Sequence, residues 1–123
     1  MALTPGIERT HEFRVEGALL TDVDGTLPMP VLSTPGMIEM METAAASLVF
    51  EHLPPGHATV GFEVCVKHVG GALEGASCIA HARLHEVIEE RKLRFEVEVR
   101  EGARTIGVGT HERRVIPVNP SQP

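Results

Sequence analysis

One stretch, residues 33–50, constrains the fold of this chain more than any other, because it is the only segment with helical periodicity over a helix-scale length. Thr34 offers an N-cap oxygen, and Pro35 suits the first helical position, where its missing N–H group costs nothing. Apolar residues at intervals of three and four form one stripe along this segment: Met37, Met40, Met41, Ala44, Ala45 and Leu48. The sequence therefore predicts one long helix with a buried face.

Most of the remaining chain has the pattern of β-strands. Three segments after the helix alternate between apolar and polar residues, which is typical of strands with one buried face. Their predicted inward rows are Val60, Phe62, Val64, Val66; Cys78, Ala80, Ala82, Leu84; and Leu93, Phe95, Val97, Val99. Further strands are expected at residues 7–16 and 105–118. This order predicts a single α+β domain over residues 1–123, with an antiparallel sheet of about five strands wrapped around the helix.

Composition excludes some classes of function. The net charge of −6 and the lack of Trp and Tyr argue against a nucleic-acid partner, since such proteins use basic grooves and stacking aromatic rings. Cys65 and Cys78 fall in apolar strand patterns, so we predict two buried free thiols. We recognise no signal peptide and no apolar run of membrane-spanning length, and we expect a soluble cytoplasmic protein.

Two titratable residues are predicted to meet in an apolar setting. At about 100° per residue, Glu42 lies beside Ile38, Ala46 and Val49, at the edge of the buried face of the helix. Period two in the strand after the helix points His68 inward, toward the helix. A single inward histidine is more often a satisfied core residue than a catalyst. A carboxylate and an imidazole on one apolar surface instead indicate acid–base chemistry.

The other histidines carry no predicted role. His81 and His85 lie on one outward strand face but about 13 Å apart, which is too far for one metal ion. His111 follows a Gly-Thr pair in the last strand. A solvated or interface face is the expectation for all three, and no metal site is predicted.

The pattern Thr34, Glu42, Cys65-Val-Lys-His68 and Ile106-Gly-Val-Gly-Thr-His-Glu-Arg113 resembles the hotdog-fold thioesterases of the fluoroacetyl-CoA thioesterase type. The resemblance runs from Thr10 to Ile116. It implies a catalytic triad of Thr34, Glu42 and His68. It also implies a homodimer, or a tetramer of paired dimers, with active sites at the subunit interface.

The resemblance further implies hydrolysis of an acyl-CoA, with coenzyme A entering only as part of the substrate and no other cofactor. Glu42 would attack the thioester carbonyl or act as a general base, His68 would transfer protons, and Thr34 would orient the Glu42 carboxylate. Gly61 and Arg113 correspond to residues that line the acyl pocket. The oxyanion would lie on backbone N–H groups near Gly36, at the positive end of the helix dipole.

The sequence differs from the family pattern at one place, and other functions are also compatible with the predicted fold. The enzyme that gives this family its name carries two phenylalanines in a lid before the helix, whereas residues 25–30 here contain neither, so we expect another short acyl thioester as substrate. Hotdog folds also include dehydratases and hydratases, and fold alone does not separate them. A non-catalytic acyl-CoA-binding module or a dimerisation domain are the other readings. The sequence does not determine which acyl group is hydrolysed. It also does not determine whether that group is carried by CoA or by a carrier protein.

Overall fold

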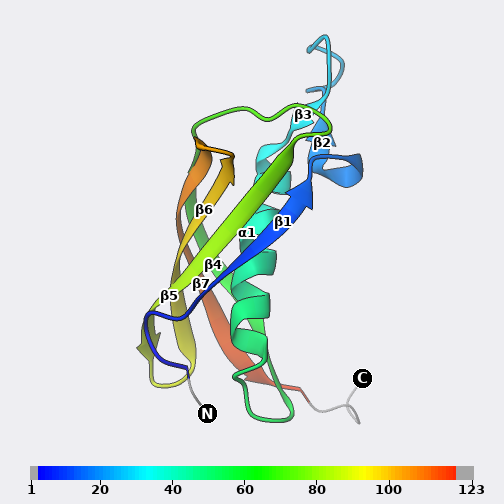
Figure 1. The fold of residues 1–123 in the computed structure, drawn as a ribbon. Helices are drawn as coiled ribbons and strands as arrows, with labels where there is room; N and C mark the ends of the chain where they lie inside the picture. Colours follow the sequence, from blue (N-terminus) through cyan, green and yellow to red (C-terminus); the bar gives the residue numbers. More distant parts are fainter. Residues whose placement is uncertain (1–2, 119–123) are drawn as a thin grey trace.

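The computed structural model describes residues 3–118, and Figure 1 shows one long helix lying along a sheet. The elements, in chain order, are β1 (Glu8–Arg14), a short 3₁₀ turn η1 (Gly17–Leu19), β2 (Leu20–Thr21), β3 (Val31–Leu32), α1 (Thr34–Phe50), β4 (His57–His68), β5 (Ser77–Ile88), β6 (Lys92–Glu101) and β7 (Arg104–Pro117). The five predicted long strands and the helix are confirmed. The small β2–β3 pair inside the connection before the helix was not predicted.

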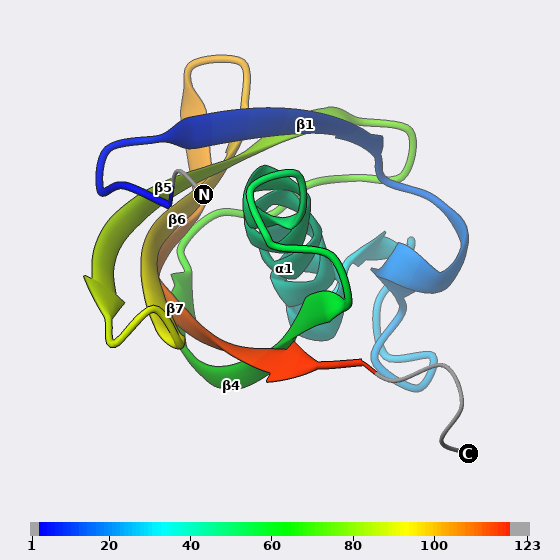
Figure 2. The same cartoon turned by 90° about the horizontal axis from the view of Figure 1, so that it is seen from below.

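The sheet has the order β1-β5-β6-β7-β4, and every pairing in it is antiparallel. Seen along the helix, it curls around α1 so that β1 and β4 flank the helix from opposite sides (Figure 2). β1 and β4 are therefore the two edges of the sheet among the described strands. β4 is the next strand after the helix, and it carries His68 on an edge of the sheet that lies beside the helix with Glu42.

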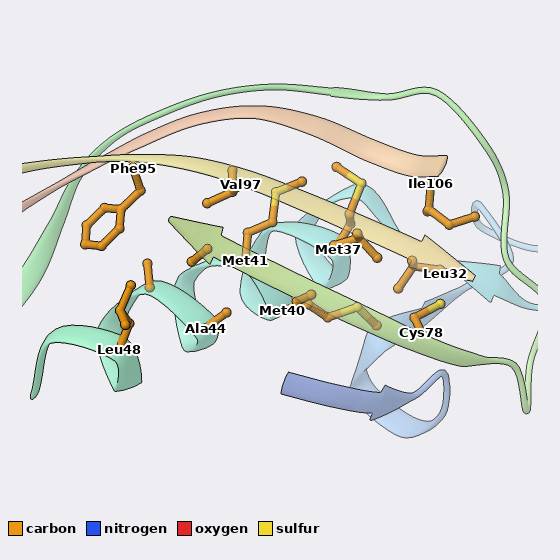
Figure 3. Close-up of a cluster of buried hydrophobic side chains, with 14 of the residues drawn as sticks. Leu32, Met37, Met40, Met41, Ala44, Leu48, Cys78, Phe95, Val97 and Ile106 are labelled. Atoms are coloured by element: carbon orange, nitrogen blue, oxygen red, sulfur yellow. The ribbon is translucent and has the colours of Figure 1, made fainter. Parts of the chain in front are cut away.

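The core lies between the helix and the middle of the sheet. All six residues of the predicted apolar stripe are buried, and the inward rows of β5 and β6 are buried as well. Figure 3 shows Met37, Met40 and Met41 pointing from the helix toward the strands that carry Cys78, Val97 and Ile106. Methionine side chains are unbranched and fill irregular gaps, which suits a helix seated in a curved sheet with few aromatic residues.

The start of the helix differs from the prediction by one residue. Ser33 is the N-cap, because its hydroxyl oxygen accepts a hydrogen bond from the Gly36 N–H group at 2.9 Å. Thr34 is the first helical residue and Pro35 the second. The prediction of Thr34 as the cap was wrong. With capping done by Ser33, the Thr34 hydroxyl is free to contact another element.

The predicted regular alternation along β4 was also wrong. The pairing register with β7 shifts between Gly61 and Glu63, which makes Phe62 a bulge residue. Phe62 and Val60 are therefore not in the core but are 58% and 44% exposed. Gly61 and His68, which an unbroken strand would point to opposite faces, both face the helix.

The two thiols also differ. Cys78 is buried in the core, as predicted, and its burial raises the pKa of the thiol. Cys65 is exposed on the edge strand, so its predicted burial was wrong. Over residues 3–118 no helix has the length and apolar character needed to cross a membrane.

Candidate active site

The first part of the candidate site joins the start of the helix to the end of β4. The Thr34 hydroxyl oxygen lies 2.9 Å from Nδ1 of His68, within hydrogen-bond distance. The helix cap at Ser33 and the pairing of His68 with Gly107 hold the two backbones in place. The sequence prediction that His68 points toward the helix is confirmed.

The other ring nitrogen of His68 has no hydrogen-bond partner. Among residues 3–118, Nε2 of His68 is the only buried side-chain nitrogen or oxygen without one. A buried polar atom left unpaired costs about 1–3 kcal/mol, and such atoms are rare away from functional sites. Nε2 is therefore the atom of this ring whose hydrogen-bonding capacity is unused within the chain.

The second part of the site surrounds Glu42, on the middle of the helix. Oε2 of Glu42 lies 3.6 Å from Nη1 of Arg113, an ion pair between a carboxylate that is 40% exposed and a guanidinium that is 10% exposed. A Cβ atom added to Gly61 would lie 2.7 Å from the same Oε2. Gly61 therefore lets the carboxylate lie directly against the β4 backbone. Glu42, Gly61 and the residues up to Val64 line a hollow of about 290 Å³.

Arg113 is held beside Glu42 by three hydrogen bonds. Its Nε donates to Oγ1 of Thr59 at 2.8 Å, its Nη2 donates to the Thr59 carbonyl at 3.0 Å, and its Nη1 donates to Nε2 of His111 at 3.2 Å. Burial lowers the pKa of Arg113, and the charge of Glu42 offsets part of this effect. The guanidinium therefore remains a fixed positive charge beside Glu42.

His111 belongs to this network, although the sequence indicated no role for it. The expectation of a solvated or interface position was wrong, since His111 is only 2% exposed. Alternation along the last strand could have found it, because His111 and Arg113 are two residues apart and share one face. His81, in contrast, lies on the outside, where its Nε2 is 2.6 Å from the Glu8 carboxylate. Within the described residues, no group of three or more His, Cys, Asp or Glu residues could hold a metal ion.

The two parts of the site do not meet within one chain. Thr34 and Glu42 are eight residues apart, so the helix separates them by about 12 Å. The Thr34 hydroxyl contacts His68, and the prediction that it orients Glu42 was wrong for the single chain. The Gly36 N–H group donates to Ser33, so it is not itself one of the free oxyanion donors expected near Gly36.

The sequence pattern of a family described as fluoroacetyl-CoA-specific thioesterase matches residues 15–119. The chain belongs to this family. It is 36% identical to a fluoroacetyl-CoA thioesterase from Streptantibioticus cattleyicolor over 86 residues. These 86 residues make up 70% of this chain and 61% of that enzyme. The chain thus spans less than two thirds of that relative's length.

Solved structures agree with the family assignment. One structure of a fluoroacetyl-CoA thioesterase gives a TM-score of 0.86 at 29% identity and covers 96% of this chain and 91% of that one. A thioesterase superfamily member from Thermus thermophilus gives a TM-score of 0.84 at 25% identity, covering 94% and 85%. The prediction of a hotdog fold is confirmed.

The buried histidine of this family member gives a pH prediction. Burial is the main cause that lowers the pKa of His111, and the neighbouring Arg113 adds to it. The folded protein thus keeps His111 neutral at a pH where the unfolded chain, with a histidine pKa of about 6.5, takes up a proton. Stability is therefore lost as pH falls below about 6.5 toward the lower pKa of the folded state.

The variant His111→Gln lacks this titration, and its amide can donate to one neighbour and accept from the other. We expect the free energy of unfolding, measured with urea, to fall less steeply from about pH 7 to about pH 5 in this variant than in the wild type. All other residues are the same in both proteins, so the difference between the two slopes reports on His111 alone. Parallel pH dependences would contradict the prediction.

Proposed function

We propose that this protein hydrolyses a short acyl-CoA thioester, with Thr34, Glu42 and His68 as the catalytic residues. The observation that carries the proposal is the Glu42 carboxylate, held by Arg113 against Gly61 at the edge of an apolar core. Membership of a thioesterase family supports the reaction class. The unpaired Nε2 of His68 supplies the proton-transfer group that the reaction needs.

In the proposed reaction, a carboxylate oxygen of Glu42 attacks the thioester carbonyl carbon. The C–S bond breaks, the acyl group remains on Glu42 as an anhydride, and the thiolate of coenzyme A leaves with a proton from His68. Water then gives a proton to His68 and attacks the anhydride, which releases the carboxylic acid and regenerates Glu42. General-base activation of water by Glu42 is the alternative; mass spectrometry of rapidly quenched reactions would reveal an acyl adduct on Glu42 only in the first case.

We further propose that each active site combines two subunits of a homodimer. Along the open edge of β4, Val60, Phe62 and Val64 are 44%, 58% and 38% exposed, which is unusual for apolar residues that are neighbours in one strand. Antiparallel pairing of two β4 edges about a two-fold axis would run the partner strand in reverse. The Gly61 end of one strand would then lie beside the His68 end of the other.

This pairing accounts for the two separated parts of the site. Glu42 lies over Gly61 at one end of β4, and the Thr34–His68 pair lies at the other end. Reversal across the axis brings Glu42 of the partner subunit toward the unpaired Nε2 of His68. The triad would thus take Thr34 and His68 from one subunit and Glu42 from the other.

Mixing two inactive variants tests the shared site. Glu42→Ala and His68→Ala are each expected to be inactive as homodimers. Refolded together in equal amounts, they should recover about a quarter of wild-type turnover, because half of the dimers are mixed and each mixed dimer has one complete site of two. Mixing Glu42→Ala with Glu42→Ala,His68→Ala is the control and should stay inactive. A triad within one chain predicts no recovery in the first mixture.

The loop before the helix bears on the choice of acyl group. The loop before the helix exposes the apolar residues Leu27 and Met29, and residues 25–30 contain no phenylalanine. We propose a short acyl group other than fluoroacetyl. A panel of short, branched and aromatic acyl-CoA thioesters, with carrier-protein thioesters beside them, tests this by product mass spectrometry. Binding of acyl-CoA without turnover of any member would contradict hydrolysis and favour a binding module.

A further inference from the structure

We propose that His111 is a positioning residue for Glu42. Its imidazole holds Arg113 in place beside the carboxylate and also fastens the β4 bulge that turns Gly61 toward the same carboxylate. The inference rests on the proposed function, since it assigns His111 a part in the chemistry of that site.

The hydrogen bonds of His111 determine which of its nitrogens carries the proton. Nδ1 lies 2.7 Å from the carbonyl oxygen of Glu63, and a carbonyl oxygen only accepts, so Nδ1 is the donor. Nη1 of Arg113 lies 3.2 Å from Nε2, and a guanidinium only donates, so Nε2 accepts. The ring is therefore neutral and in one tautomer, and both of its nitrogens have a hydrogen-bond partner. The ring of Phe95 stacks on it at 6.0 Å between centroids and fixes its plane.

The first effect of His111 is on Arg113. Two of the three N–H contacts of Arg113 go to Thr59 and orient the Nε–Nη2 side of the guanidinium. The third nitrogen, Nη1, is the one that faces Glu42, and His111 is its hydrogen-bond partner. At 3.6 Å the contact with Glu42 is too long for a hydrogen bond. The position of Nη1 is thus set by His111, together with the two hydrogen bonds to Thr59, rather than by Glu42.

The second effect is on the bulge. The Glu63 carbonyl that accepts from His111 directly follows the bulge residue, Phe62. On the opposite face, the Arg114 guanidinium lies 3.6 Å from the centre of the Phe62 ring, and Arg114 also donates to the buried Glu112 carboxylate at 2.7 Å. His111 and Arg114, both on β7, therefore contact the bulge from its two faces. His111 contacts the bulge on the face that carries the active site, through its hydrogen bond to the Glu63 carbonyl oxygen.

Two amide variants that differ by one methylene separate positioning from general stability. His111→Asn can donate to Glu63 but is too short to reach Arg113, whereas His111→Gln can contact both. We expect His111→Asn to lower kcat about 10–100-fold with a small change in KM, and His111→Gln to recover most of the loss. His81→Asn, on the outer face, is the matched control and should retain wild-type kinetics.

A double-mutant cycle tests whether His111 acts through Arg113. If it does, His111→Asn combined with Arg113→Met should be no slower than Arg113→Met alone. The proposal would be overturned if the two single losses in kcat multiplied in the double variant. A folded His111→Asn protein with normal kcat would overturn it as well. Thermal unfolding of each variant checks that it is folded in the assay; His111→Phe, which keeps the stack on Phe95, replaces the Asn variant if that variant unfolds.

Hydrogen exchange at Arg113, measured by NMR, tests the positioning role of His111 without requiring that the protein hydrolyse a thioester. The Nε–H group of Arg113 donates to Thr59 and should give a slowly exchanging NMR signal. Loss of that protection in His111→Asn and its retention in His111→Gln would support positioning even if no acyl thioester were hydrolysed. Unchanged protection in both variants would overturn positioning even if the wild type proved to be a thioesterase.

Discussion

Replacing Glu42 with Gln should reduce thioester turnover by at least about 10³-fold, because the amide keeps the size of the side chain but can neither attack a carbonyl nor take a proton from water. The substitution leaves the buried face of the helix untouched, since Glu42 lies at its edge with 40% of the side chain exposed. Stability should therefore change by less than about 1 kcal/mol. The measurement is the initial rate of acid release, followed by mass spectrometry so that the exposed Cys65 thiol does not interfere.

A second glutamate on the same helix is the control for this prediction. Glu39 lies three residues before Glu42, is exposed, and borders no hollow of the site. Glu39→Gln removes the same charge from the same helix and should leave kcat within about two-fold of the wild type. If Glu42→Gln retained a tenth or more of the wild-type rate, Glu42 would be neither the nucleophile nor the base. Equal losses in both variants would point to an effect of helix charge.

The helix and the sheet could be predicted because each depends on a local period. A stripe at intervals of three and four can only be buried as a helix face, and Met37 to Leu48 lie where that stripe places them. The rows beginning at Cys78 and Leu93 are buried for the same reason, as period two separates the faces of a strand. His68 was placed correctly because it lies on the regular part of β4, after the bulge.

The wrong predictions concern places where one inserted residue interrupts the alternation of a strand, or where the contacting residues are distant in sequence. The bulge at Phe62 adds one residue to β4, which reverses the facing of everything before it, and no pattern within the strand reveals this. His111 reaches the site through a contact with Glu63 that only the pairing of β4 with β7 brings about, while its other partner, Arg113, lies two residues along the same strand. Ser33 and Thr34 are both good caps, so sequence alone did not separate them.

Gly109 is the position where we expect the largest loss of stability. A Cβ atom there would overlap the carbonyl oxygen of Cys65 and would lie 2.6 Å from the Cα atom of Val66. Both are backbone atoms of β4, so no side-chain rotation relieves the overlap. β7 and the edge strand β4 approach so closely at this point that only glycine fits between them.

Gly109→Ala should therefore lower the free energy of unfolding by about 3 kcal/mol or more, at the upper end of the usual cost of overpacking. The strands must separate at Val66, two residues before His68, so kcat should fall as well in the fraction that remains folded. Gly71→Ala is the matched control, because a Cβ atom there meets nothing within 4 Å, and it should change stability by less than about 0.5 kcal/mol. Urea unfolding of both variants measures the difference. Equal stabilities would mean that β4 can move away from β7 at little cost, and the pairing that positions His68 would then be looser than its register indicates.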